Sequence, residues 1–491
     1  MSIASPPTLL IRGGEVIDGT GAPRRAADVL VSDGMIHALV PPGTGSAAQV
    51  IDARGLVVCP GFIDTHSHDD LLALHPVVPH PKLVQGVTTV VTGNCGISLA
   101  PLLCEQPPAP LDLLGRDVFR YDSFKAYLKA LDDVGPSVNV VPLVGHTTLR
   151  IRHVGDLGRP ASDAEIGRMR DEVSQALDAG AFGMSTGVYY PPAQAATTEE
   201  LIGVCAALRG RQSILAMHIR NEGDHIEASV EEALRVGAAS QAHLVFSHHK
   251  VVGPRNHGRT QQTLRTIEDA ARFQSVCLDC YPYEASSTML CPDRAAQVEN
   301  VLITWSKTHP EHSGKSLKSI AGTWGVGLRE AAQRLLPGGA IYFALAAEDV
   351  ERVLAHPLVM IGSDGLPHDR HPHPRLWGTY PRVLGHYSRD RGLMSLETAV
   401  HKMTGLPAQR FGLADRGTVA VGQAADLVVF DPAEVRDNAT YEDPTQAPSG
   451  IHAVMVNGRL AVSQGRHLEA HAGRRLVRTP VQPGLPSPTR R

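Results

Sequence analysis

VCPGFIDTHSH, residues 58–68, is an apolar stretch that ends in two histidines spaced two residues apart. In a β-strand, residues i and i+2 face the same side, so His66 and His68 can point together toward one metal ion at the end of a strand. A lone His-x-His pair is weak evidence for a metal site. Here the pair follows PGFID and opens a series of strand-like runs, which makes it a strong indication.

Further strand-like runs follow along the chain, with amphipathic helical stretches between most of them. Residues 163–180 (DAEIGRMRDEVSQALDAG) and 225–239 (HIEASVEEALRVGAA) repeat their apolar residues with a helical period. Eight strands with helical crossovers predict an α/β protein built on a (β/α)8 barrel of the TIM type. The strand-like runs are 58–68, 86–95, 139–146, 181–187, 213–220, 242–250, 275–283 and 358–365.

Both ends of the chain differ from this middle, because they consist of short strand-like runs broken by Gly and Asp turns. Asn457-Gly458 is a β-hairpin signal in the second of these regions. We expect residues 1–60 and 414–475 to form one small β-sandwich beside a barrel of residues 61–413. A segment of about residues 285–345 is too long for an ordinary barrel connection, and it predicts an inserted lid subdomain. Residues 476–491 are rich in proline and are expected to be disordered.

The composition of the 491-residue chain argues against several classes of protein. Lys and Arg number 46 against 50 Asp and Glu, a formal net charge of −4, and no basic run suggests nucleic acid. No apolar run is long enough to span a bilayer, and the N-terminus lacks a secretory leader pattern. Seven scattered cysteines indicate a reducing compartment. We expect a cytoplasmic protein that acts on a small molecule, without a nucleic-acid or membrane partner; the oligomeric state stays open.

Polar side chains recur at the ends of the predicted strands, where barrel enzymes carry their chemistry. Cys95 ends one strand-like run, and a thiolate is a strong zinc ligand. His218 and His248 lie at the ends of two later runs, so that with Cys95 they predict a site with an open position for water, the pattern of catalytic zinc. Asp364 follows the last run and is placed to act as a general base.

Other residues near these strand ends receive different interpretations. His249 faces the opposite side of its strand from His248 and is expected to support the site or the fold. His146 either contacts the substrate or braces a loop, and both alternatives stay open. Cys277 and Cys280 have a CxxC spacing, but no second pair accompanies them, which favours core residues over a metal or redox site.

Several motifs together resemble the metal-dependent amidohydrolase superfamily: PGFIDTHSHDD, SDG and LPAQRFGLADRGTVAVGQAADLVVFDP. Within it, GNCG, STGVYY, HIRNE, SHHK, YPY and PHPRLWG are similar to the D-aminoacylase group, over nearly the full length of the chain. The resemblance implies one tightly bound zinc, held by the cysteine and the two later histidines, and a second position that is weak or empty. The implied metal ligands are His66, His68, Cys95, His218 and His248, and the implied catalytic residue is Asp364.

The resemblance also implies a reaction, the hydrolysis of an N-acyl-D-amino acid to a carboxylate and a free D-amino acid. The implied ligands of the substrate α-carboxylate are Lys250, Tyr281, Ser287 and Arg375, a suitable set because it combines a guanidinium fork, an ammonium charge and hydroxyl donors. The stretch SSTMLCPDRA…ITWSKTHPEHSG looks most like the N-acyl-D-glutamate deacylase branch. In that branch an arginine matching Arg294 faces the substrate side chain.

Alternatives to this substrate remain. Within the group they are a broad D-aminoacylase and an N-acyl-D-aspartate deacylase, and the acyl group is open. Hydantoinases and dihydroorotases, which open cyclic amides, usually bridge their metals with a carboxylated lysine, whereas Cys95 stands at that level here. A catalytically inactive scaffold would tend to lose ligands, yet every expected ligand type is present.

Overall fold

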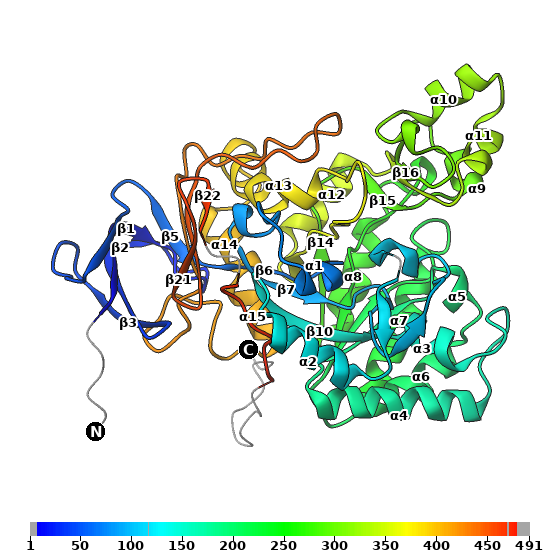
Figure 1. Cartoon of the computed structure of the whole chain (residues 1–491), viewed down its shortest axis with the longest axis horizontal. Helices are drawn as coiled ribbons and strands as arrows, with labels where there is room; N and C mark the ends of the chain where they lie inside the picture. The colour runs from blue at the N-terminus through cyan, green and yellow to red at the C-terminus, as the bar shows by residue number, and fades with distance from the viewer. Residues whose placement is uncertain (1–6, 116, 469–470, 479–491) are drawn as a thin grey trace.

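Eight parallel strands form a barrel at the centre of the molecule (Figure 1). They are β6 (Phe62–Asp64), β7 (Val87–Thr92), β10 (Asn139–Gly145), β11 (Gly183–Gly187), β12 (Ile214–His218), β13 (His243–Phe246), β14 (Val276–Cys280) and β18 (Val359–Ile361). In this computed structural model, which describes residues 7–115, 117–468 and 471–478, the strands follow in chain order around the sheet. The ring closes beyond β6 and β18, where the Asp364 N–H donates to the His66 carbonyl oxygen over 2.7 Å. The predicted barrel is confirmed.

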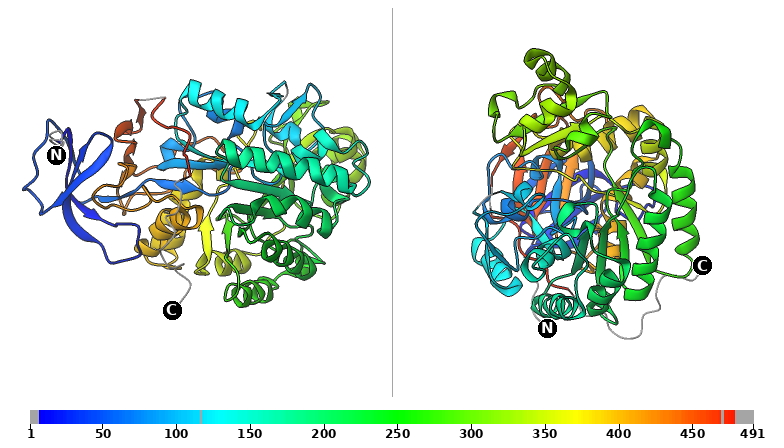
Figure 2. Two further views of the ribbon diagram at one scale, coloured as in Figure 1. Left: turned by 90° about the horizontal axis from the view of Figure 1, so that it is seen from below. Right: turned by 90° about the vertical axis from the view of Figure 1, so that its right-hand side faces the viewer.

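Helices cover the outside of the barrel (Figure 2). The N-terminus of the longest of them, α4, is fixed by a capping box, in which Ser162 accepts from the Glu165 N–H and the Glu165 side chain accepts from the Ser162 N–H. Gly180, with a φ of 118°, ends the same helix. The helices of this layer are α1 (Asp70–Leu74), α2 (Phe124–Val134), α3 (His146–His153), α4 (Asp163–Ala179), α5 (Pro191–Gln194), α6 (Thr198–Cys205), α7 (Ile226–Ser240), α8 (Thr260–Ala270), α12 (Ala347–Ala355), α13 (Arg375–Arg382), α14 (Leu396–Met403) and α15 (Gly405–Phe411).

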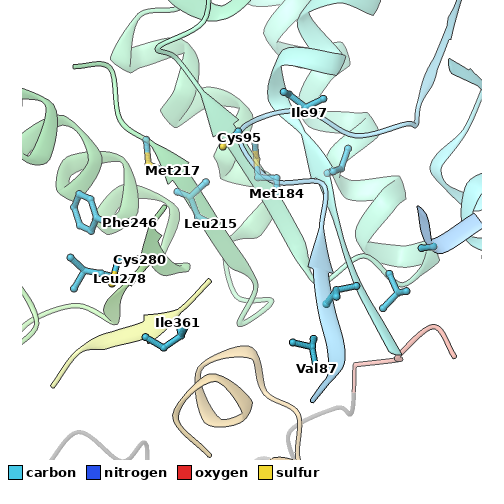
Figure 3. Close-up of a cluster of buried hydrophobic side chains, with 14 of the residues drawn as sticks. Val87, Cys95, Ile97, Met184, Leu215, Met217, Phe246, Leu278, Cys280 and Ile361 are labelled. Atoms are coloured by element: carbon cyan, nitrogen blue, oxygen red, sulfur yellow. The ribbon is translucent and has the colours of Figure 1, made fainter. Parts of the chain in front are cut away.

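Strand alternation divides the apolar residues between two cores. Val91 packs with the cluster inside the barrel, whereas its neighbour Val90 packs with the cluster between strands and helices. Figure 3 shows part of the outer cluster, in which Val87 lies near the start of β7 and Cys95 lies beyond its other end. Cys95 is therefore fixed by a packed core on one side and faces the polar mouth of the barrel on the other.

Strands from both ends of the chain form one nine-stranded sheet beside the barrel (Figures 1 and 2). β5 and β19 join the two contributions through antiparallel pairing of Pro60 with Leu427. Six of the strands share a single apolar cluster, as expected for a small sandwich-like module. The strands are β1 (Leu9–Val16), β2 (Arg25–Ser32), β3 (Met35–Val40), β4 (Gln49–Asp52), β5 (Val57–Pro60), β19 (Leu427–Phe430), β20 (Ile451–Val456), β21 (Arg459–Ser463) and β22 (Arg466–His467).

The inserted subdomain lies above one side of the barrel, at upper right in Figure 1, and has its own apolar cluster. It contains a small sheet of β15 (Ser286–Met289), β17 (Gly338–Tyr342) and β16 (Val301–Ser306), with α9 (Pro292–Ala295), α10 (Leu317–Trp324) and α11 (Leu328–Arg334). The loop after β18 holds it, because the His371 N–H donates to the Thr304 carbonyl oxygen over 3.0 Å. A separate hairpin of β8 (Leu102–Cys104) and β9 (Phe119–Tyr121) follows β7.

The C-terminal tail departs in part from the expectation of disorder after residue 475. Leu476 is buried, and its N–H donates to the Val140 carbonyl oxygen over 2.9 Å, so residues 476–478 pack against β10. Burial of the apolar Leu476 side chain against the barrel orders these residues, although the proline content of the segment predicts disorder. Residues 479–491 lie outside the described residues. Within the described ranges, every helix is too short or too polar to cross a bilayer.

Candidate metal centre and active site

The ends of four barrel strands bring nitrogen and sulfur donors together. Cys95 Sγ lies 3.2 Å from His66 Nε2 and 3.4 Å from His248 Nε2. His218 Nδ1 lies 3.0 Å from His248 Nε2. Cys95, His218 and His248 each offer one donor atom to a buried group whose atoms lie within 4.8 Å of one another. A thiolate and two imidazoles in this arrangement match the donors of a zinc site that keeps one position open.

A second group of donors shares the same cysteine. It consists of His66, His68, Cys95 and Asp364, whose donor atoms also lie within 4.8 Å of one another. His68 Nε2 lies 3.2 Å from Asp364 Oδ1, and His66 Nε2 lies 3.6 Å from the same oxygen. Because Cys95 belongs to both groups, its sulfur can serve either position or bridge two ions. The donor chemistry therefore fits one or two transition-metal ions.

Three residues of these groups have a left-handed backbone. The φ angles are 53° at Cys95, 36° at His248 and 49° at Asp364. Side chains other than glycine disfavour this region by on the order of 1 kcal/mol or more, so the surrounding packing must impose it. Each of these residues follows directly on a barrel strand or its short extension. Strain of this kind at three converging side chains is typical of a preorganised functional site.

Neighbouring charges keep two of the groups anionic. Burial alone would raise the pKa of the Cys95 thiol, but the charges of His66 and His248 outweigh burial and hold this pKa well below its ordinary value. Burial also opposes ionisation of Asp364, yet Arg375 and His248 hold the pKa of its carboxyl well below the usual range. A thiolate can bind a metal, and a carboxylate can accept a proton.

Two buried carboxylates that were not predicted orient the histidines. Asp279 Oδ1 accepts from the His248 backbone N–H over 2.7 Å and lies 3.2 Å from His66 Nδ1. Glu222 Oε1 lies 3.4 Å from His248 Nδ1 and 3.6 Å from His218 Nε2. Outer carboxylates of this kind fix the ring orientation and the tautomer of metal-binding histidines. Asp279 lies within the CLDC stretch and Glu222 within HIRNE. Both motifs are noted from the sequence, but neither carboxylate was predicted to belong to the site.

A cationic, hydroxyl-bearing group lies next to these donors. The Tyr281 ring has Lys250 Nζ 5.7 Å and Arg375 Cζ 4.5 Å from its centroid. Arg375 Nη1 lies 2.9 Å from Asp364 Oδ2, and Arg375 Nη2 donates to the Ser287 carbonyl oxygen over 3.0 Å. The Tyr281 hydroxyl and Ser287 Oγ are buried and lack a hydrogen-bond partner among the described residues. This group therefore has unused donors directed at a buried space, which suits an anionic ligand.

Arg294 approaches from the inserted subdomain. It donates to the Tyr189 hydroxyl over 3.2 Å and to Ser286 Oγ over 2.9 Å, and its guanidinium lies 4.2 Å from the centroid of the Tyr342 ring. Tyr189 in turn stacks on His218 with ring centroids 5.1 Å apart. A cavity of about 770 Å³ runs beside Tyr189, Glu222 and Arg294. The space between the subdomain and the barrel thus leaves room for a ligand beside the half-buried Arg294 guanidinium.

The sequence of the chain matches a known family over most of its length. The profile of the amidohydrolase family aligns with residues 49–462, which include all eight barrel strands and the whole inserted subdomain. The chain belongs to the amidohydrolase family. It is accordingly a hydrolase, and the resemblance stated from its motifs is confirmed.

Three relatives of this amidohydrolase have stated activities. An N-acyl-D-aspartate deacylase of Alcaligenes xylosoxydans xylosoxydans is 53% identical over 453 residues, covering 92% of this chain and 91% of the relative. A D-aminoacylase of the same organism is 52% identical over 479 residues, covering 97% and 99%. The crystal structure of an N-acyl-D-glutamate deacylase from Bordetella bronchiseptica, with zinc and a phosphonate inhibitor, has a TM-score of 0.92 and 46% identity, covering 96% of this chain and 100% of the other.

The remaining polar residues singled out from the sequence support the structure of the amidohydrolase. His249 Nε2 lies 2.8 Å from Thr263 Oγ1, and burial lowers the pKa of this histidine to about 4. His146 Nε2, at the start of α3, lies 3.3 Å from Glu200 Oε1 of α6, so its ring faces the helix layer. Cys277 and Cys280 are free thiols on opposite faces of β14, so they form neither a disulfide nor a shared site.

Proposed function

We propose that this amidohydrolase hydrolyses N-acyl-D-amino acids with an acidic side chain, and that N-acyl-D-glutamate is its preferred substrate. The observation that carries the proposal is the position of the cationic group beside the donor cluster. A substrate α-carboxylate bound by Lys250, Tyr281, Ser287 and Arg375 would place the adjacent acyl amide next to Asp364, because Arg375 contacts Asp364 directly. The activities of the relatives support the D configuration and the amide substrate.

Zinc is the metal that we propose for the centre. Cys95, His218 and His248 would hold it tightly, and His66 and His68 would form a weaker second position with the shared cysteine. The choice of zinc rests on the soft sulfur and imidazole donors and on the zinc in the N-acyl-D-glutamate deacylase structure. Bound there, the ion would polarise the acyl carbonyl and activate water for attack.

Asp364 would handle the protons of the reaction. Its carboxylate takes a proton as the water oxygen bonds to the acyl carbon. When the C–N bond breaks, Asp364 returns this proton to the departing nitrogen, so that a carboxylic acid and a free amine result. Proton delivery to the nitrogen matters as much as attack by water, because without that proton the amine would have to leave as a nitrogen anion, a very poor leaving group.

Arg294 would select the side chain. The Arg294 side chain is half-buried, its hydrogen-bond partners are the neutral Tyr189 and Ser286, and it forms no ion pair with a carboxylate of the described residues. A half-buried cation whose hydrogen-bond partners are neutral is costly, and a substrate carboxylate would pair with it. An apolar side chain would leave the charge uncompensated, so such a substrate should be strongly disfavoured.

The test is kcat/KM for N-acetyl derivatives of D-glutamate, D-aspartate and D-leucine. We expect D-glutamate to exceed D-leucine by about 10²-fold or more, and Arg294→Ala to remove most of that difference by lowering kcat/KM for D-glutamate. Arg334→Ala is the matched control, since Arg334 lies in the same subdomain and packs on Trp324 away from the site. A wild-type preference for D-leucine, or an undiminished preference in Arg294→Ala, would show that Arg294 does not select the substrate.

N-acyl-D-aspartate is the second candidate substrate, because the N-acyl-D-aspartate deacylase of Alcaligenes xylosoxydans xylosoxydans is 53% identical to this chain over 453 residues. D-aspartate is one methylene shorter than D-glutamate, so the same guanidinium would have to reach further. The same three-substrate comparison decides between the two. A kcat/KM for N-acetyl-D-aspartate above that for N-acetyl-D-glutamate would replace the glutamate assignment and retain the acidic class.

A further inference from the structure

Glu222 occupies a central position that the proposed reaction leaves unused. It lies four residues beyond His218 and is only 6% exposed. One oxygen, Oε1, faces three nitrogens: Lys250 Nζ at 2.5 Å, His248 Nδ1 at 3.4 Å and His218 Nε2 at 3.6 Å. Two of these nitrogens belong to proposed metal ligands, and the third belongs to a proposed ligand of the substrate carboxylate. A single carboxylate therefore stands between the two halves of the site.

The ring nitrogens of His218 and His248 that face the donor cluster determine where the proton of each ring must lie. His218 Nδ1 and His248 Nε2 face the donor cluster, 3.0 Å apart. A neutral histidine that binds a metal through one ring nitrogen carries its proton on the other. The protons would therefore sit on His218 Nε2 and His248 Nδ1, the atoms that face Glu222. Both rings need an acceptor at that position to hold the tautomer that binds metal.

Lys250 competes with this arrangement. Its ammonium lies 2.9 Å from His248 Nδ1, and an ammonium group can only donate hydrogen bonds. If Lys250 donates to His248 Nδ1, the ring proton must move to Nε2, the atom that faces Cys95. If the proton stays on Nδ1, two donors confront each other. A carboxylate at this position can resolve the conflict, because Glu222 Oε1 accepts from Lys250 over 2.5 Å and lies 3.4 Å from His248 Nδ1 as an acceptor for the ring proton.

We propose that Glu222 is a positioning residue that couples zinc binding to the substrate-carboxylate site, by accepting from both outer histidine nitrogens and by drawing the Lys250 hydrogen bond away from His248. The inference rests on the proposed zinc centre. On this inference, Lys250 binds the substrate carboxylate but would also weaken metal binding if Glu222 did not accept its hydrogen bond. The effect of Glu222 on zinc affinity should therefore depend on whether Lys250 is present.

The experiment measures the zinc dissociation constant of the full-length protein by competition with a chromophoric chelator. Glu222→Gln keeps the shape but removes the charge and one acceptor, so the constant should rise about 10–100-fold. Lys250→Met alone should change it little. In the double variant, Lys250→Met removes the competing donor, and the constant should return to within a few-fold of wild type. Nitrogen-15 spectra of the zinc-loaded histidine rings should show the proton on His248 Nδ1 in wild type.

Matched controls separate this role from a general effect on the fold. Glu232→Gln removes a carboxylate that pairs with Arg220 at 2.8 Å, close in sequence but outside the donor cluster, and it should leave zinc affinity unchanged. Should Glu222→Gln fail to fold, Glu222→Asp retains the charge at a shorter reach and should show a smaller rise with the same rescue. Unchanged affinity in the Glu222 variants, or equal impairment with and without Lys250, would overturn the inference.

The result is independent of turnover. A wild-type protein that binds zinc with this pattern but hydrolyses none of the three N-acetyl-D-amino acids would refute the proposed function and leave the role of Glu222 standing. Normal hydrolysis with no dependence of zinc affinity on Glu222 would refute the role of Glu222 and leave the proposed function standing.

Discussion

Asp364→Asn is expected to lower kcat by about 10²–10⁴-fold, the usual contribution of a general acid–base group. The carboxylate lies 3.2 Å from His68 Nε2 and 2.9 Å from Arg375 Nη1, which keep it ionised in the absence of substrate. Asparagine has nearly the same shape, but its amide cannot accept the proton of the attacking water or return it to the amine. The measurement is kcat at saturating N-acetyl-D-glutamate, with zinc content determined on the same sample.

Asp426→Asn is a suitable control for this loss. Asp426 is also a buried aspartate paired with an arginine, Arg416, but it lies just before β19 and outside the donor cluster. This substitution should lower the melting temperature and leave kcat per folded molecule unchanged. Near-normal kcat in Asp364→Asn, with zinc retained, would remove Asp364 from proton transfer.

Cys95→Ala is expected to release the tightly bound zinc and to abolish turnover while the barrel stays folded. The thiolate is within 3.4 Å of both His66 Nε2 and His248 Nε2, and alanine offers no donor in its place. Because even outer partners of metal ligands alter affinity by 10–100-fold, the loss of a direct ligand should exceed that range. Elemental analysis after dialysis, together with a circular dichroism melt, separates loss of metal from loss of structure.

Cys205→Ala provides the comparison, since Cys205 is a buried cysteine on α6 whose sulfur neighbour is Met184. The Cys205→Ala variant also loses one buried cysteine sulfur, and it should keep its zinc. Full zinc retention by Cys95→Ala would return Cys95 to the status of a core residue, the role that its burial alone suggests.

The features that the sequence predicts well are those fixed by strand geometry. His66 and His68 lie just beyond β6, on either side of Ser67, which forms an isolated parallel bridge with Gly365, and the two-residue spacing still brings both to the donor cluster. Cys95, His218 and Asp364 share a level because parallel strands in a barrel all end at the same rim. These residues could be placed together without knowing the angle or length of any helix.

Features that depend on loop paths and backbone strain could not be placed in this way. Glu222 lies on a loop that is tied to a loop from another strand, where the Val252 N–H donates to the Glu222 carbonyl oxygen over 2.8 Å. The left-handed backbone at Cys95 and His248 has no compositional signal, since glycine ordinarily supplies such conformations. Asp279, by contrast, follows from alternation, because it lies two residues after the inward-facing Cys277.

The pairing of β5 with β19 also constrains the order in which the chain can fold. Pro60 and Leu427 are about 370 residues apart. A ribosome that adds about 5–20 residues per second makes β5 wait roughly 20–70 s for this partner. During that time β1 covers one edge of β5, while the other edge of the apolar VVCP strand has no native neighbour. An unpaired apolar edge is a template for association between nascent chains, so the yield of folded enzyme should depend on how well this edge is shielded while the barrel is being synthesised.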